Sequence, residues 1–259
     1  MSESGDSWDP GPWKGWSYTS ARAAHDPSAG RGYGSRAGNA SSAYDSSGRS
    51  YAATPPKSVS TDSPSPLVIA VDVTGSMGVF PETMFKKLPL LDLEMKEYLD
   101  NPEICFIAVG DAYCDSHPLQ VQEFAKGKDL VDRLNGIHIE GGGGGQIMES
   151  YDLATVYGAH NIKMPKANRP IFIYVGDEGF YDTVDPDQAK RLAHVDLEKR
   201  LTSKQAVDDL KKKFSAVYCV RKLYDGSDAD HMSSIDKTLH AQWTKYLGDD
   251  KVVILNEPG

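Results

Sequence analysis

The sequence predicts an α/β protein, a three-layer sandwich in which helices flank a mostly parallel central sheet with one antiparallel edge strand. Five short apolar runs end at polar turn residues, as strands buried on both faces of a parallel sheet do. Segments with helical spacing of apolar residues alternate with these runs. A further run, Leu119–Phe124, alternates apolar and polar residues, which is typical of a half-buried edge strand.

The first strand is predicted at Leu67–Val71 and the first helix at Pro81–Asp100. Pro81 suits the first turn of a helix, whereas Pro89 predicts that this helix is kinked or split in two. The other predicted elements are strands at 104–109, 119–124, 171–175, 216–220 and 252–255, and helices at 128–134, around 151–159, and at 188–197, 203–214 and 229–247.

Residues 1–65 differ in composition from the predicted domain at 66–259. They are rich in Gly, Ser, Ala, Pro, Asp and Arg, and almost lack Leu, Ile and Val, so we expect a flexible extension. Three of the four tryptophans lie here, at Trp8, Trp13 and Trp16. Either the extension is an inert tail, or its aromatic side chains dock on a partner or on the domain. A proline-containing stretch, 55–66, is interpreted as the linker.

The overall composition excludes several classes of protein. A net charge of −9 argues against nucleic-acid binding, which needs a basic surface. No apolar run approaches the roughly 20 residues that span a bilayer, and no secretory signal is recognised, so we expect no membrane contact. Cys105, Cys114 and Cys219 form neither a CxxC pair nor a zinc pattern. Buried thiols at Cys105 and Cys219 fit a reducing, cytoplasmic protein.

The candidate site follows the first strand. Asp72 ends that strand, and Thr74 and Ser76 lie in the next turn. Carboxylate and hydroxyl oxygens are ligands that Mg²⁺ and Mn²⁺ prefer, and ligands of open α/β sheets bind beyond the carboxyl ends of the strands. The motif therefore predicts a divalent-ion site, although these residues could instead merely cap the following helix.

The segment Asp72-Val73-Thr74-Gly75-Ser76 resembles the metal-ion-dependent adhesion site of von Willebrand factor A domains, which has the form Asp-x-Ser/Thr-x-Ser. The following Met77-Gly78 is common in intracellular members, so the chain resembles the intracellular bacterial type. Asp177 matches the aspartate that completes the family's metal site after a later strand. The resemblance implies a Rossmann-like fold. If its strand order is 3-2-1-4-5-6, the strands that end at Asp72 and Asp177 are neighbours at the switch point of the sheet.

One part of the family pattern is missing. The family's loop threonine would fall after the glycines at 141–145, where this chain has Gln146, whose carbonyl oxygen or a water could replace it. Glu149 could point at the site or cap its helix. Three further residues, Asp111, Asp115 and His117, are predicted to rim the site.

The resemblance implies a metal-dependent protein–protein interaction module, an adaptor in a larger assembly. Its Mg²⁺, or Mn²⁺ or Ca²⁺, would bind an Asp or Glu of the partner, and similar bacterial proteins act with MoxR-type AAA+ ATPases. One alternative is a scaffold protein that acts mainly through its aromatic N-terminal tail. A remote alternative is a phosphotransferase of the haloacid-dehalogenase type, but that chemistry needs Asp-x-Asp and position 74 is Thr. We therefore expect no enzymatic activity.

Overall fold

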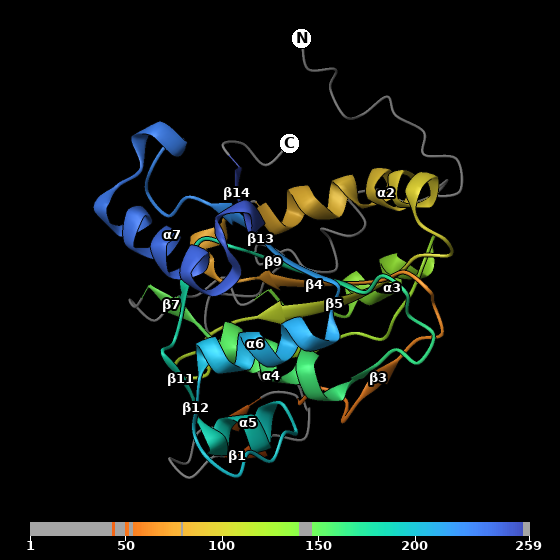
Figure 1. Ribbon diagram of the computed structural model, residues 1–259, viewed down its shortest axis with the longest axis horizontal. Coiled ribbons are helices and arrows are strands. Elements are labelled where there is room, and N and C mark those ends of the chain that lie inside the picture. The colour runs from red at the N-terminus through yellow and green to blue at the C-terminus, as the bar shows by residue number, and fades with distance from the viewer. Residues whose placement is uncertain (1–42, 45–49, 52–53, 79, 140–146, 256–259) are drawn as a thin grey trace, which may run out of the picture.

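The computed structural model describes residues 43–44, 50–51, 54–78, 80–139 and 147–255. A six-stranded sheet runs through the centre of this part, with its strands in the order β14-β13-β9-β4-β5-β6 (Figure 1). In chain order the strands are β4 (Pro66–Asp72), β5 (Glu103–Val109), β6 (Leu119–Val121), β9 (Ile171–Gly176), β13 (Ala216–Lys222) and β14 (Val252–Leu255).

The strand directions confirm a mostly parallel sheet with one antiparallel edge. Every neighbouring pair from β14 to β5 is parallel, and β6 pairs with β5 in the antiparallel sense. After β4 the chain first adds β5 and β6 on one side, and later adds β9, β13 and β14 on the other. The order therefore reverses between β4 and β9, and ligands of open α/β sheets bind at such a switch point.

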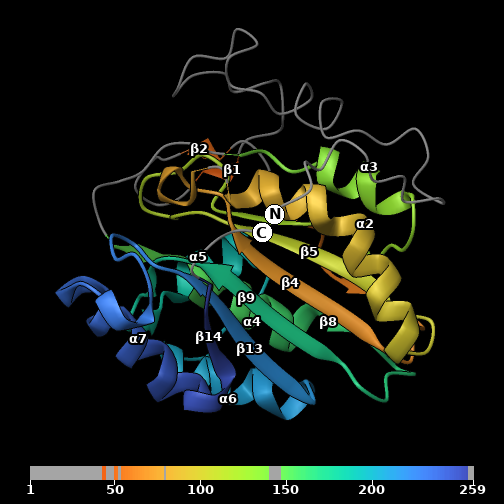
Figure 2. The same cartoon turned by 90° about the horizontal axis from the view of Figure 1, so that it is seen from above.

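Helices cover both faces of the sheet (Figures 1 and 2). Apolar side chains of α2 and α3 belong to the core on one face, and those of α4, α6 and α7 to the core on the other. The helices are α2 (Phe80–Tyr98), α3 (Asp129–Asn135), α4 (Tyr151–Asn161), α5 (Pro186–Leu192), α6 (Ser203–Lys213) and α7 (Ser234–Leu247).

Strand β4 is buried on both faces. Val68 and Ala70 belong to the core that contains α4, whereas Ile69 and Val71 belong to the core that contains α2. Because successive side chains of a strand point to opposite faces, two covered faces require an unbroken apolar run. The apolar run ends at Asp72, the last residue of β4, which lies at the carboxyl end of the strand.

Three predicted helices differ from the structure. The helix expected at 188–197 is α5, which ends at Leu192. The helix expected at Pro81–Asp100 is not split, because α2 continues through Pro89 as a single element. The helix expected at 229–247 is divided into a 3₁₀ turn, Ala229–His231, and α7. The break arises because the Ser233 hydroxyl accepts a hydrogen bond from the amide of Asp236 and so caps a new helix start.

The segment before β4 packs on the domain. The Tyr157 hydroxyl donates to the carbonyl of Pro56 at 2.8 Å, and the His194 ring bonds to the carbonyl of Pro55 at 2.8 Å. Strand β3 (Val59–Ser60) pairs with β8 (Ile162–Lys163). The predicted linker thus lies against α4 and its neighbours from residue 54 onward.

Other parts of the sequence lie outside the described residues, namely the three tail tryptophans, the glycines 141–145 and Gln146. In the described part, no helix is both long and apolar enough to cross a bilayer.

Candidate functional site

Asp72 is fully buried at the end of β4, and its two carboxylate oxygens have different partners. Oδ1 accepts hydrogen bonds from the Thr74 amide at 2.8 Å and from the Thr74 hydroxyl at 2.6 Å. This is the local turn that aspartate side chains form with the backbone two residues later. The Thr74 hydroxyl therefore points at Asp72 and makes no cap bond to the 3₁₀ turn Gly75–Met77 that follows.

The second oxygen of Asp72 is bound from across the core. Oδ2 accepts a hydrogen bond of 3.0 Å from the hydroxyl of Tyr151, the first residue of α4. Burial and the charges of Asp72 and Asp177 raise the pKa of Tyr151 well above its ordinary value, so this hydroxyl keeps its proton and acts as a donor.

The strand next to β4 supplies the second aspartate. Asp177 follows β9 and is fully buried, and its Oδ1 accepts a hydrogen bond of 3.0 Å from the Ser76 hydroxyl. The hydroxyls of Ser76 and Thr74 are 3.2 Å apart. The structure thus brings together four of the five candidate ligands, Asp72, Thr74, Ser76 and Asp177, and we call their side chains the oxygen cluster.

Close packing at Gly176 permits this arrangement. A Cβ atom at this position would lie 1.7 Å from the Tyr151 hydroxyl oxygen and 3.1 Å from Cβ of Asp72. Only a glycine lets the end of β9 pass beside both side chains.

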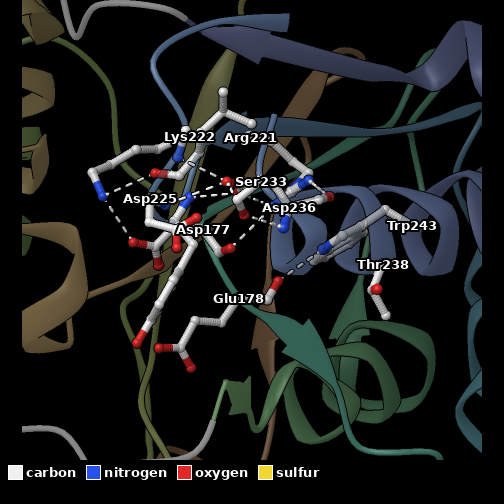
Figure 3. Close-up of polar contacts among 12 residues, drawn as sticks. Asp177, Glu178, Arg221, Lys222, Asp225, Ser233, Asp236, Thr238 and Trp243 are labelled. Atoms are coloured by element: carbon white, nitrogen blue, oxygen red, sulfur yellow. Dashed lines mark hydrogen bonds and ion pairs between the residues drawn. The ribbon is translucent and has the colours of Figure 1, made fainter. Parts of the chain in front are cut away.

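A lysine from the next strand also reaches the oxygen cluster. Lys222, the last residue of β13, donates to Asp177 Oδ2 at 2.9 Å (Figure 3). It also donates to the backbone carbonyl of Ser76 at 3.0 Å. Lys222 is not among the site residues predicted from the sequence. A signal was present, because Lys222 follows a predicted parallel strand and so had to reach the same sheet edge as Asp72 and Asp177.

A buried ion pair holds the turn after β9 in place. Arg221 and Asp236 are both fully buried, with 3.5 Å between Nη2 and Oδ1. Nη2 of Arg221 also donates to the carbonyl of Asp177 at 3.1 Å, as Figure 3 shows. The Asp236 carboxylate in turn accepts hydrogen bonds from the backbone amides of Tyr224 and Gly226. The pair therefore ties the loop between β13 and α7 to the oxygen cluster.

Trp243 of α7 supports the same turn from the core. Its indole nitrogen donates to the backbone carbonyl of Glu178 at 2.8 Å (Figure 3). Its ring packs against Phe180 and Tyr151, with centroids 4.5 Å and 5.1 Å apart. A fully buried tryptophan thus connects the residue after Asp177 with the tyrosine that binds Asp72.

The acidic groups of the site repel one another. Burial, followed by the charge of Asp177, raises the pKa of Asp72 to about 7. Burial and the charges of Asp72 and Asp177 raise the pKa of Glu178 to about 8. The pKa of Glu149 is raised furthest, to about 12, by burial and then by the charges of Asp72 and Glu178. At neutral pH Glu149 therefore stays protonated and adds no charge.

The predicted rim residues divide into two groups. Asp111 and Asp115 are buried, and both raise the pKa of Glu149. Their loop lies beside the residue after Glu149, because the Ser150 hydroxyl accepts a hydrogen bond of 2.9 Å from the Ala112 amide. The Asp115 carboxylate accepts the amide of Asp111 at 2.7 Å. The ring of His117 instead lies against that of His138, with centroids 4.2 Å apart.

The chemistry of the oxygen cluster suits a hard divalent cation. In the described part of the chain, no group of three or more His, Cys, Asp or Glu side chains is arranged as a metal site. The oxygen cluster is a different donor set, because two of its four side chains are hydroxyls. Beside it, Glu149 Oε2 and Glu178 Oε2 are buried without a hydrogen-bond partner. The Glu178 oxygen, once that carboxyl is ionised, fits a cation that prefers oxygen ligands, whereas the protonated Glu149 offers no charge to it.

The comparisons with known proteins concern the fold alone. No protein-family model and no curated protein matches the sequence. Two crystal structures of the pilus adhesin SpaC from Lactobacillus rhamnosus GG, one of them in an open conformation, are similar at 11% and 10% identity, each with a TM-score of 0.51. The similar region covers 78% of this chain but only 30% and 29% of the adhesin chains. Proximal thread matrix protein 1 from the mussel byssus is similar at 10% identity, over 76% of this chain and 45% of that chain, with a TM-score of 0.48.

Proposed function

We propose that this chain is a metal-dependent protein-interaction module with the three-layer, Rossmann-like fold of von Willebrand factor A domains. In this proposal the oxygen cluster binds Mg²⁺, or Mn²⁺ or Ca²⁺, and the bound ion accepts an Asp or Glu of a protein partner. One observation carries the proposal. The side chains of Asp72, Thr74, Ser76 and Asp177 form a continuous chain of polar contacts across the ends of two adjacent strands, at the switch point of the sheet.

The charges near the oxygen cluster favour an acidic partner once a divalent ion is bound. Two ionised aspartates would balance the dication, and the ammonium of Lys222 at 2.9 Å from Asp177 would add one positive charge. Glu149, with its pKa at about 12, contributes no opposing charge at neutral pH. Counting only the ion, the two aspartates and Lys222, the centre of the loaded site would carry one positive charge, which would attract a carboxylate.

Coordination leaves room for that carboxylate. Mg²⁺ takes about six oxygen ligands and usually keeps several waters. The four side chains of the oxygen cluster do not complete this number, and a partner's oxygen could replace a water. Gln146, outside the described residues, stays a candidate ligand in place of the family's threonine.

The site favours binding over catalysis. A phosphotransferase of the haloacid-dehalogenase type needs a second carboxylate at position 74 as its acid–base group. Thr74 stands there, and its hydroxyl donates to Asp72. We accordingly propose an adaptor of the cytoplasm, and a MoxR-type AAA+ ATPase is the first partner class to test.

Affinity capture with and without Mg²⁺ tests the proposal. The full chain should retain a partner in the presence of excess Mg²⁺ and release it in excess EDTA. Asp72→Ala should abolish capture. Asp196→Asn is the matched control, because Asp196 is an exposed aspartate whose ion pair with Lys190 lies on the surface. Capture that survives both EDTA and Asp72→Ala would refute the metal bridge.

A deletion separates this function from the scaffold alternative. Removal of residues 1–53 leaves intact the contacts of Pro55 and Pro56 with the domain. A partner lost on this deletion but unaffected by Asp72→Ala would show that the tail is the binding element.

A further inference from the structure

The ammonium of Lys222 is bound in the manner of a coordinated cation. It donates to Asp177 Oδ2 at 2.9 Å, to the Ser76 carbonyl at 3.0 Å and to the Leu223 carbonyl at 3.3 Å. An ammonium has three N–H donors and no acceptor, so these three oxygens use its full capacity. One of them is a carboxylate and two are carbonyls, the oxygen types that also bind hard metal ions.

Two of the three acceptors belong to residues of the oxygen cluster. Ser76 and Asp177 bind each other through the Ser76 hydroxyl and Asp177 Oδ1, and both bind Lys222 through other oxygens. Figure 3 shows the lysine stem crossing from β13 to Asp177. Strand β13 is parallel to β9 with Arg221 opposite Gly176, so the sheet itself places Lys222 beside the Asp177 turn.

A divalent ion at the oxygen cluster would meet this ammonium at close range. Both cations would draw on Asp177 and Ser76, and like charges repel strongly where water is largely excluded. Asp177 is fully buried, and the Lys222 side chain is 29% exposed. The side chain of Lys222 is flexible and partly exposed to solvent, so its ammonium can move away from Asp177 when the divalent ion binds. If the ammonium stays, its repulsion with the ion weakens ion binding.

From this arrangement we infer that Lys222 is an internal cation that competes with the divalent ion and sets the affinity of the site for it. The inference rests on the proposed function for the identity of the site. It assigns to Lys222 a role separate from that of the ligands. Without metal, the ammonium of Lys222 balances the charge of the buried Asp177 carboxylate. When the metal binds, the ammonium either withdraws from Asp177 or stays and is repelled by the ion.

Isothermal titration of the full chain with Mg²⁺, Mn²⁺ and Ca²⁺ tests the inference. Lys222→Met should bind the ions about tenfold more tightly than the unaltered chain, because one nearby positive charge is removed. Lys222→Arg keeps the charge and should show no such gain. Lys211→Met is the matched control, because Lys211 also donates to backbone carbonyls, those of Tyr246 and Leu247 at the end of α7. It should leave the affinity unchanged.

A second measurement covers the case in which Lys222→Met folds poorly. Lys222→Gln keeps a donor for Asp177 and removes the charge, and it should show the same gain in affinity. Both neutral variants should melt at a lower temperature than the unaltered chain in EDTA, and saturating Mg²⁺ should restore the loss.

The outcomes separate this inference from the proposed function. If the unaltered chain binds the ions and the neutral variants bind no more tightly, the inference is overturned and the metal-binding proposal stands. If only the neutral variants bind, the inference holds in its strongest form and the unaltered chain is not a metal module. If no chain binds any of the three ions, both are overturned.

Discussion

Ser76 and Asp177 share a hydrogen bond of 3.0 Å although 101 positions separate them in the chain. The bond joins the turn after β4 to the turn after β9, which lie next to each other because these strands pair in parallel. It completes the oxygen cluster, because Ser76 also lies 3.2 Å from the Thr74 hydroxyl that binds Asp72. Four consequences of this arrangement can be measured.

Replacement of Asp72 by asparagine should separate stability from metal binding. The amide oxygen can still accept the two hydrogen bonds from Thr74, and the amide nitrogen can donate to the Tyr151 hydroxyl oxygen in place of the bond that Oδ2 accepts, while the charge that Asp177 repels is gone. In EDTA, Asp72→Asn should therefore raise the melting temperature by about 2–4 °C. The increase that Mg²⁺ causes in the unaltered chain should disappear. The control Asp196→Asn, at an exposed ion pair, should change neither the melting temperature in EDTA nor its increase in Mg²⁺. If Mg²⁺ still raised the melting temperature of Asp72→Asn, Asp72 would be excluded as a ligand.

The stability of the metal-free protein should fall as the pH rises from about 4 to about 8. The pKa of Asp72 is raised from 3.8 to about 7 and that of Glu178 from 4.5 to about 8, so in this window the folded chain binds more protons than the unfolded chain. The stability that these groups contribute is then fully present below about pH 4 and is lost as the pH rises through the folded values.

A divalent ion should reverse part of this loss, because it binds the ionised carboxylates. Melting temperatures in EDTA and in Mg²⁺, compared at intervals from pH 5 to pH 8.5, should diverge as the pH rises. Curves that stay parallel over this range would show that Asp72 and Glu178 do not titrate together with ion binding.

Replacement of Gly176 by alanine should disrupt the site and the core together. The added methyl group would overlap the Tyr151 hydroxyl oxygen at 1.7 Å, so the bond from Tyr151 to Asp72 must break or β9 must shift. Overpacking of this kind costs about 3 kcal/mol. Gly127→Ala is the control, because Gly127 has a positive φ of 57° but no atom within 4 Å of an added Cβ. Gly127→Ala should lower the free energy of unfolding by about 1 kcal/mol. If urea unfolding showed a larger loss for Gly127→Ala than for Gly176→Ala, the close packing at Gly176 would be contradicted.

Replacement of Trp243 by phenylalanine should weaken the turn that carries Asp177. The new side chain keeps an aromatic ring beside Phe180 but removes the donor to the buried carbonyl of Glu178. An unpaired buried acceptor costs about 1–3 kcal/mol. Urea unfolding should show this loss, whereas Tyr98→Phe, at a side chain that is 79% exposed, should be neutral. Equal stabilities of the two variants would mean that the indole nitrogen contributes nothing to this turn.

Much of the fold could be predicted from the sequence. The apolar runs located every strand of the central sheet, and the alternation within 119–124 identified the antiparallel edge strand, β6. These features are local, because a strand buried on both faces has to be apolar throughout. Helix ends were less predictable: the start of α7 depends on the cap that Ser233 forms, and Pro89 did not divide α2.

The oxygen cluster was predictable from the sequence and its surroundings were not. Asp72, Thr74 and Ser76 lie two residues apart, so a single turn brings them together whatever the rest of the chain does. The position of Asp177 required the strand order in addition. Lys222, like Asp177, could be placed only from its position at the end of a parallel strand, and Tyr151 had no such signal, since it reaches Asp72 through the packing of α4.

The sequence by itself thus determined the strands, the sheet edge at which polar groups gather and the oxygen donors in the turn after β4. The tertiary structure decided which distant charges share that edge. Three strand ends converge there, and burial leaves the carboxylates of Asp72 and Asp177 with little water to screen them. Their interaction with each other and with Lys222 therefore depends on distances of a few ångströms between segments far apart in the chain, which only the folded sheet establishes.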